Sequence, residues 1–334
     1  MLTSRAAVTR ALADLTDAAP VIIACSGGPD SLALAGVASH VARQRGHRTL
    51  AVVVDHDLQA DSARVAQWAA DTCMALGVDD AVVRRVRVGT DGGPEAAART
   101  ARYSVLEEVA ADRGAAAVLL GHTRDDQAET VLLRLARGSG ARSLSGMREA
   151  NGLWRRPFLS LARVDVQSVA RELLAPLGEV PWTDPHNADP SFARVRVRSL
   201  LDDLSAAVGP GAALGLARSA DLLRDDADAL DAWAQREAAR LVLVDGDLEC
   251  ASCDELAGLP RAVRTRVLRT MCLAAGALAD QLTAEHIWRI DEFVTDWRGQ
   301  GEASLPCGVV VTRAYGRLCV RSARADQGTP TQME

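Results

Sequence analysis

Three short polar motifs carry residue types that suit phosphate chemistry: SGGPDS (26–31), DHD (55–57) and GHTRDDQAET (121–130). Each follows an apolar run directly. In the first motif, glycines leave backbone N–H groups exposed at the start of a helix pattern, where the helix dipole favours an anion. The carboxylate of Asp30 would repel an anion, unless it binds a Mg²⁺ ion that bridges to the phosphates. The motif therefore predicts a pyrophosphate site; the alternative is an ordinary turn in which Asp30 caps the helix.

The third motif concentrates acidic groups at the beginning of a helix. Asp126, Glu129 and Thr130 lie three and four residues apart, so they share one helix face. That face could bind an ammonium group or a second Mg²⁺, and His122 ends the strand before it. A carboxylate in a first turn is also a good helix cap, which is the alternative for one of Asp125 and Asp126.

The composition excludes several kinds of site. All 38 basic residues are Arg, because the chain contains no Lys. A GxxxxGK phosphate loop is therefore impossible, and so is chemistry that needs a Lys side chain of the protein. The net charge of −6 argues against a basic nucleic-acid binder as a whole, but a local basic patch would suffice.

The seven Cys residues are scattered through a long chain, which fits a reducing cytoplasm and not a disulfide framework. Cys250 and Cys253 form a CxxC pair, but no second pair of Cys or His lies at a spacing typical of zinc. We therefore interpret these two residues as incidental thiols.

The first two hundred residues alternate strand and helix patterns. Continuous apolar runs at 21–25, 49–55 and 115–122, with a weaker run at 81–88, are typical of parallel strands. The pattern predicts an α/β domain with a doubly wound, Rossmann-like parallel sheet. Ligands of such sheets bind beyond the carboxyl ends of the strands, so the three motifs are expected to share one crevice.

The pattern changes at Gly209-Pro210-Gly211, which we predict as the domain boundary. Residues 1–208 would form the α/β domain, and 209–322 a smaller, mainly helical domain that ends in a β-hairpin. Residues 323–334 are polar and are predicted to be disordered. No apolar run reaches 18 residues and the N-terminus reads as a helix, so neither a membrane span nor a signal peptide is expected.

SGGPDS resembles the SGGxDS loop of the N-type ATP pyrophosphatases, the PP-loop superfamily. Further stretches resemble the tRNA(Ile)-lysidine synthase family: VDHDLQADS (54–62), EAAARTARYSVL (95–106), LLGHTRDDQAETVLLRLARGSG (119–140), LSGM (144–147), RRPFL (155–159), and WTDPHNAD with RVRVR (182–198). The resemblance implies a cytoplasmic ligase with ATP as substrate and Mg²⁺ as cofactor. It would adenylate the wobble cytidine of CAU-anticodon isoleucine tRNA, and the side-chain amine of free L-lysine would then displace AMP.

The resemblance also assigns the residues of the site. Catalysis would use Asp30, Arg102, His122, Asp126 and Glu129, with Asp30 and Asp126 as metal ligands. ATP would contact Ser26, Gly27, Gly28, Pro29, Asp30, Ser31, Asp55 and His56. Clustered arginines suit phosphate contact and base stacking. The predicted tRNA contacts are Arg137, Arg142, Arg155, Arg194 and Arg198, in patches that also hold Arg134, Arg148, Arg156, Arg163 and Arg196.

Several alternatives stay open. Tyr103 suits packing better than chemistry, and Val195 stands where the family often has Asn. The closest rival function is a tRNA thiolation enzyme of the same superfamily, although Cys25 lies in a strand and Cys73 in a helix. A non-catalytic ATP-binding regulator would share the loop. No membrane partner is expected, and a homodimer is left open.

Overall fold

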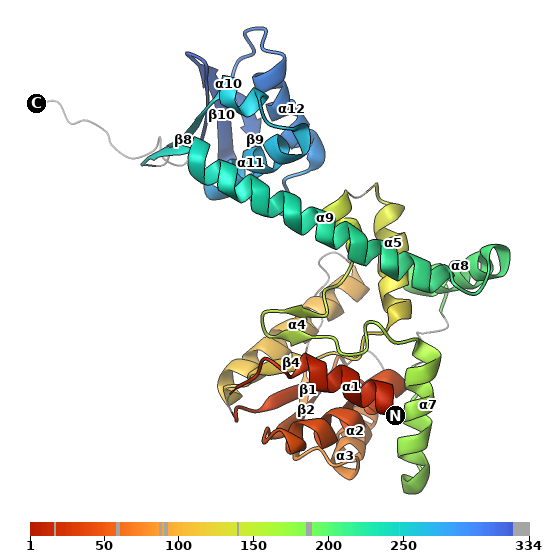
Figure 1. Cartoon of the computed structure of the whole chain (residues 1–334). Coiled ribbons are helices and arrows are strands. Elements are labelled where there is room, and N and C mark those ends of the chain that lie inside the picture. The colour runs from red at the N-terminus through yellow and green to blue at the C-terminus, as the bar shows by residue number, and fades with distance from the viewer. Residues whose placement is uncertain are drawn as a thin grey trace, which may run out of the picture. The chain divides into compact units, whose positions relative to one another are not determined.

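The computed structural model of the chain describes residues 1–16, 18–57, 61–86, 89, 93–138, 140–184, 189–246 and 248–322. The chain divides into two compact units, Met1–Leu223 and Arg224–Glu334 (Figure 1). The predicted disordered tail at 323–334 lies outside the described residues.

The first unit is built on a six-stranded sheet of order β3-β2-β1-β4-β6-β5. The strands β1, β2, β3, β4 and β6 are parallel, and only the edge strand β5 runs antiparallel. The chain moves outward from β1 through β2 to β3, then returns to place β4 on the other side of β1. This confirms the predicted doubly wound sheet and puts its topological switch point between β1 and β4. The strands are β1 (Val21–Cys25), β2 (Thr49–Asp55), β3 (Asp80–Arg85), β4 (Ala117–Leu119), β5 (Ala150–Asn151) and β6 (Trp154–Arg155).

Helices cover both faces of this sheet because alternate strand residues point to opposite sides. Val21 and Ile23 of β1 join one buried cluster with α1, α2, α3 and α7. Ile22, between them, joins a second cluster with α4. The helices of this unit are α1 (Leu2–Ala11), α2 (Pro29–Gln44), α3 (Ser62–Ala75), α4 (Pro94–Arg113), α5 (Arg124–Leu135), α6 (Ala141–Leu144), α7 (Arg163–Leu174), the 3₁₀ turn η1 (Ala175–Leu177) and α8 (Ala193–Val208).

Gly209-Pro210-Gly211 separates α8 from the 30-residue helix α9 (Ala212–Leu241), which runs across the division at residue 223. The predicted terminal hairpin is confirmed as β10 paired with β11. It belongs to a five-stranded antiparallel sheet of order β7-β8-β11-β10-β9, whose short outer strands gave no clear period in the sequence. The second unit contains β7 (Leu243–Asp245), β8 (Leu248–Ser252), α10 (Cys253–Ala257), α11 (Arg261–Ala274), α12 (Ala284–Thr295), β9 (Ala303–Leu305), η3 (Pro306–Gly308), β10 (Val309–Ala314) and β11 (Arg317–Ser322).

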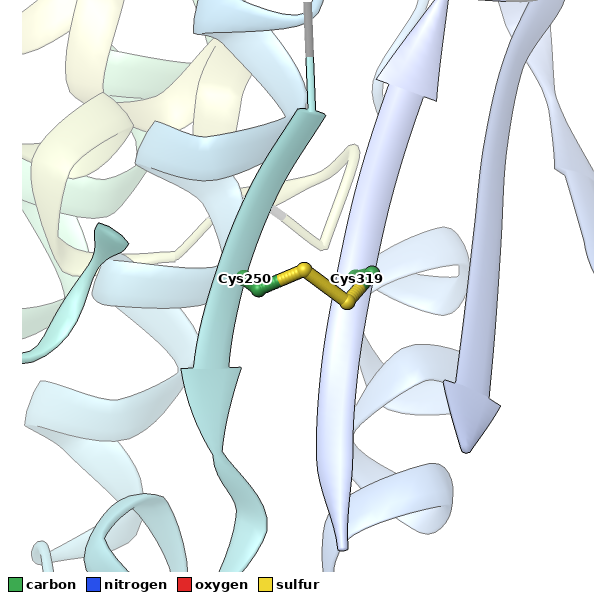
Figure 2. The surroundings of a disulfide bond; sticks show 2 residues. All are labelled: Cys250 and Cys319. Atoms are coloured by element: carbon green, nitrogen blue, oxygen red, sulfur yellow. A yellow bond between two sulfur atoms is a disulfide. The ribbon is translucent and has the colours of Figure 1, made fainter. Parts of the chain in front are cut away.

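Cys250 and Cys319 form a disulfide that joins β8 to β11 (Figure 2). The two residues face each other directly in the antiparallel register, with Cα atoms 4.2 Å apart. The prediction that Cys250 is an incidental thiol is therefore wrong. The sequence concealed the pairing because the partner lies 69 residues away and is set by strand register. Cys253, the other residue of the CxxC pair, is a buried free thiol.

No single helix in the described part of the chain is long and apolar enough to cross a membrane; α8 and α9 meet that test only as a sharply bent pair.

Candidate active site at the sheet switch point

The SGGPDS loop turns the chain from β1 into α2. Gly27 has φ +78°, a conformation that residues with a Cβ rarely adopt, and Gly28 is the N-cap of α2. The Ser31 hydroxyl donates to the Gly28 carbonyl at 3.0 Å and accepts the Ser26 N–H at 3.2 Å. Gly28 takes the N-cap position and the Asp30 side chain makes no capping bond, so the capping alternative for Asp30 fails. The loop is a preformed turn closed by its own serines.

The GHTRDDQAET motif crosses directly over the start of α2. A Cβ added at Gly121 would lie 3.1 Å from the Asp30 carbonyl oxygen and 3.3 Å from the Ser31 Cα. Glycine therefore lets the segment after β4 approach the loop after β1 without moving the neighbouring backbone. The first and third motifs therefore meet at the switch point, as the parallel sheet predicts.

A cavity of about 660 Å³ opens beside this contact in the first unit. Its walls combine residues from β1, β2, the segment that follows β4, and the helices α2, α4, α5, α7 and α8. Of the predicted site residues, it is lined by Ser26, Gly28, Pro29, Asp30, Ser31, His56, Arg102, His122, Asp126, Glu129, Arg194 and Arg198. It is also lined by Val195, which stands at the position where the family often has Asn, and by Arg163, Gln167, Asp184 and Phe192, which were not assigned to the active site.

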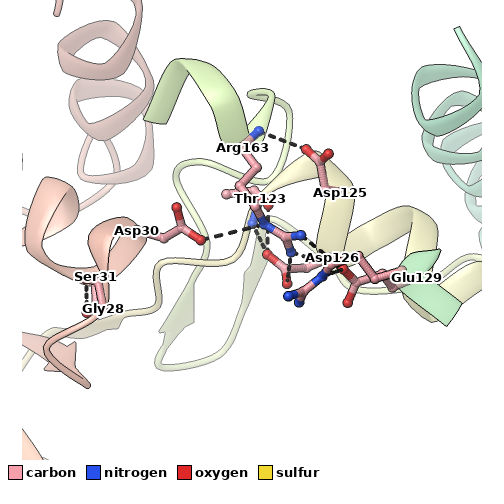
Figure 3. Close-up of polar contacts among 9 residues, drawn as sticks. Gly28, Asp30, Ser31, Thr123, Asp125, Asp126, Glu129 and Arg163 are labelled. Carbon is pink, nitrogen blue, oxygen red and sulfur yellow. Dashed lines mark hydrogen bonds and ion pairs between the residues drawn. The ribbon is translucent and has the colours of Figure 1, made fainter. Parts of the chain in front are cut away.

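Arg163, the first residue of α7, lies at the centre of an acidic cluster (Figure 3). Its guanidinium donates to Asp126 Oδ1 at 2.8 Å and to Glu129 Oε1 at 3.1 Å, and its Nε lies 3.8 Å from Asp30 Oδ2. Arg198 adds a second guanidinium to Glu129 Oε1 at 3.0 Å. These contacts do not support the grouping of Arg163 with the arginines expected to meet tRNA, because they pair it with carboxylates of the cavity.

Asp126 also caps α5. Its Oδ2 accepts the Thr123 N–H and the Thr123 hydroxyl, each at 2.7 Å. Both Asp126 oxygens are thus engaged, which does not support its predicted role as a metal ligand. In the described residues, no three His, Cys, Asp or Glu side chains form a group that could hold a metal ion.

Asp30 is better suited than Asp126 to bind Mg²⁺, through one carboxylate oxygen. Its Oδ1 is buried and has no hydrogen-bond partner among the described residues. Burial raises the pKa of this carboxyl to about 7, although Arg163 opposes the rise. Mg²⁺ is usually held in proteins by one or two carboxylates plus substrate phosphates, so Asp30 beside a phosphate loop suits it.

Another part of the cavity lining contains cations. Arg102 on α4 is partly buried, and desolvation lowers its pKa together with the neighbouring Arg99 and Arg194. His122 follows β4, where burial lowers its pKa to about 3 and keeps the imidazole neutral. Arg102 Nε and His122 Nδ1 are buried without a hydrogen-bond partner in the described part of the chain. A buried polar group without a hydrogen-bond partner destabilises the folded protein, so this part of the lining suits an anionic or polar ligand that would supply the missing partner.

Tyr103 does more than pack against Trp154. Its hydroxyl accepts from Arg99 at 3.1 Å and from Arg156 at 3.5 Å, and Arg99 lies over its ring at 4.9 Å. These cations lower the pKa of the phenol, although burial opposes them. Tyr103 thus helps to hold the guanidinium groups around the cavity.

Five predicted site residues lie outside the lining of the cavity. Gly27 shapes the loop, and Asp55 is buried with its Oδ1 accepting the Asp57 N–H at 2.9 Å. Arg137 and Arg142 are exposed near the end of α5 and on α6. Arg155 is buried and pairs with Asp14 at 2.9 Å, a placement that does not support its predicted contact with tRNA.

Comparison with known proteins identifies the chain's family. Residues 2–204 match the model of the PP-loop domain, and residues 252–319 match the TilS substrate binding domain. The tRNA(Ile)-lysidine synthase of Thermobifida fusca is 54% identical over 95% of this chain and 96% of its own length. The chain belongs to the tRNA(Ile)-lysidine synthase family. The enzyme of the same name from Streptomyces coelicolor is 50% identical over 90% of this chain and 85% of its own.

Among solved structures, the chain resembles the U34-tRNA thiolase NcsA of Methanococcus maripaludis. The TM-score is 0.55 at 19% identity, over 66% of this chain and 78% of that one. At this identity the likeness concerns the fold, which tRNA(Ile)-lysidine synthases and that thiolase share.

Proposed function

We propose that the protein is an ATP-dependent ligase that joins free L-lysine to the wobble cytidine of CAU-anticodon isoleucine tRNA. The observation that carries this proposal is the single cavity in which a phosphate loop, buried cations and an acidic cluster converge. ATP, a polyanion, suits the loop and the arginines, whereas the ammonium of lysine suits the carboxylates. Membership of the tRNA(Ile)-lysidine synthase family supports the same reaction.

In the first step, the cytidine 2-carbonyl oxygen attacks the α-phosphate of ATP, and the bond to the pyrophosphate breaks. The loop from Ser26 to Ser31 would hold the departing pyrophosphate with backbone N–H groups. Asp30 would hold Mg²⁺, which would supply charge neutralisation on the phosphates. Arg102 would stabilise the charge that develops on the α-phosphate, because its guanidinium lines the cavity and its buried Nε has no partner among the described residues.

In the second step, the side-chain nitrogen of lysine attacks the cytidine C2, and AMP leaves with the bonding electrons of the C2–O bond. Lysine must lose a proton to become a nucleophile. Asp126 and Glu129 would hold its ammonium and accept that proton, since they lie one turn apart on the cavity side of α5.

The tRNA would enter along α8, where Arg194 and Arg198 line the cavity beside Phe192. Arginine and aromatic planes stack on unpaired bases, as an anticodon nucleotide in the site requires. Arg137 and Arg142, being exposed, stay predicted phosphate contacts. A cytoplasmic setting and a homodimer also stay predictions; light scattering of the purified protein would test the dimer.

The test is to incubate the protein with ATP, Mg²⁺, lysine and a transcribed CAU-anticodon isoleucine tRNA. Mass analysis of the digested tRNA should find lysine on the cytidine, with AMP and pyrophosphate released in equal amounts. A cytidine that stays unchanged or gains sulfur would contradict the proposal.

The thiolation alternative has one specific observation in its favour. Cys25 lines the cavity, with its Sγ accepting the Gly27 N–H at 3.4 Å. However, Cys25 is 5% exposed and is tied into the loop, which is the setting of a structural thiol. Replacing Cys25 with Ala should therefore leave lysine ligation within about threefold. Loss of all tRNA modification, with ATP binding retained, would favour the thiolation alternative.

A further inference from the structure

The guanidinium of Arg163 occupies the place where the carboxylates of the cavity converge. Its Nη2 lies 2.8 Å from Asp126 Oδ1 and 3.1 Å from Glu129 Oε1, and its Nη1 lies 3.1 Å from the same Glu129 oxygen. Its Nε faces Asp30 Oδ2 at 3.8 Å. The three acidic residues come from two helices, α2 and α5 (Figure 3), and the guanidinium of Arg163 between them offsets their mutual repulsion.

The backbone around Arg163 fixes this arrangement. The Arg163 N–H donates to Asp125 Oδ2 at 2.7 Å, so α7 begins against the first turn of α5. Further along α7, Leu173 packs where a Cβ on Gly36 of α2 would lie only 2.8 Å from its Cδ1. Arg163 is therefore held from both sides, and its side chain is 16% exposed.

An ammonium group that binds Asp126 Oδ1 or Glu129 Oε1 meets an oxygen that Arg163 already holds. Asp126 Oδ2 is committed to the cap at Thr123, so Asp126 Oδ1 and Glu129 Oε1 are the oxygens that face the guanidinium. Arg163 and an ammonium are both positive, so they also repel each other across a few ångströms of partly buried space.

We propose that Arg163 is a resident counter-cation that competes with the substrate ammonium for Asp126 and Glu129, and so sets the affinity for lysine. This rests on the proposed function, because lysine is the cation in question. Arg163 is a positioning residue in this scheme: it holds the carboxylates ionised and aimed while the cavity is empty, then shares them with the ligand.

The experiment compares wild type with Arg163→Gln in equilibrium dialysis of labelled L-lysine, without ATP, tRNA or Mg²⁺. Removing the competing charge should tighten lysine binding about tenfold or more. A residue that merely supports the fold would give unchanged or weaker binding, and that result would overturn the proposal. Arg171→Gln is the matched control, because Arg171 lies on the same helix, is exposed, and bonds only to the Gln167 carbonyl among the contacts described.

Two further variants keep the test decisive. Arg163→Lys retains the charge, so its lysine affinity should stay within about threefold of wild type. Should Arg163→Gln fail to fold, the same comparison is made between Asp30→Asn and Asp30→Asn/Arg163→Gln, where the double variant should bind lysine more tightly. Ligation by the wild type is measured separately: its absence would refute the proposed function, whereas ligation without the affinity gain would refute only the role of Arg163.

Discussion

Replacing Asp30 with Asn should make the ligand-free protein more stable at neutral and alkaline pH, even though it removes an active-site carboxylate. The Asp30 side chain is 24% exposed, and its Oδ1 is buried without a partner in the described residues. Ionising it in the folded protein is therefore unfavourable. Asn keeps the shape of the side chain and carries no charge, so the variant avoids that cost.

The size of the effect follows from the pKa of Asp30, which burial raises from 3.8 to about 7 in the folded protein. The folded protein thus holds the proton more strongly than the unfolded chain does. The protonated carboxyl of Asp30 makes its full contribution to the free energy of unfolding below pH 3.8, and this contribution is lost as the pH rises to about 7. At about 1.4 kcal/mol for each unit, the loss reaches roughly 4 kcal/mol, and solvent screening reduces it to about 2–4 kcal/mol.

Thermal unfolding between pH 5 and 8.5, without ATP or Mg²⁺, measures this difference. At pH 8 the Tm of Asp30→Asn should exceed that of wild type by roughly 5 to 12 °C, and the gap should shrink steadily towards pH 5. Asp203→Asn, on the exposed side of α8, is the control and should change little. An Asp30→Asn variant that is equally or less stable at pH 8 would mean that Arg163 fully stabilises the ionised carboxylate. The variant should nevertheless lose adenylation, measured as tRNA-dependent pyrophosphate release.

Three other changes have expected outcomes. Gly121→Ala places a Cβ 3.1 Å from the Asp30 carbonyl oxygen, so the backbone of the loop must shift by a few tenths of an ångström. Calorimetry should show ATP binding weakened about tenfold, and unchanged affinity would mean that the loop accommodates the Cβ. Burial lowers the pKa of His122 to about 3, so its imidazole signals should not titrate between pH 5 and 8 in NMR spectra, and a midpoint near 6.5 would refute that burial. Cys250→Ser removes the bridge to Cys319 and should lower the unfolding free energy of the second unit by about 2–4 kcal/mol; reductant should have the same effect on wild type, and no shift in either case would exclude the disulfide in solution.

The sequence predicted the parallel sheet and the meeting of its motifs because both follow from local patterns. Apolar runs of four to eight residues mark buried strands, and parallel strands necessarily bring their carboxyl ends to one edge. Asp30 and His122 could therefore be placed in one site without knowledge of any contact. Asp55 shares that edge, but its side chain turns back to the Asp57 N–H, and no pattern in the sequence specifies that rotation.

The contacts that the sequence did not predict concern partners set by tertiary structure. Arg163 follows an arginine-rich stretch, so composition favoured a nucleic-acid contact, whereas the fold starts α7 against α5 and surrounds this guanidinium with carboxylates. Cys319 became the partner of Cys250 through the register of β8 and β11, not through spacing along the chain. Arg155 likewise forms an ion pair with Asp14, which lies 141 residues away in the sequence. Such pairs carry no local signal, because they depend on which elements become neighbours.

The absence of Lys gives the site a chemical property that no single contact explains. Every cationic side chain in the protein apart from His is an Arg, which stays protonated at any physiological pH and is a poor nucleophile. Arg102, Arg163 and Arg198 can therefore hold phosphates and carboxylates without surrendering a proton or attacking an activated carbon. The described lining of the cavity contains no aliphatic amine. In the proposed reaction, the amine that attacks the adenylated base would therefore come from the substrate. The all-arginine set of cations would then provide electrostatic stabilisation in that reaction and leave nucleophilic attack to the lysine substrate.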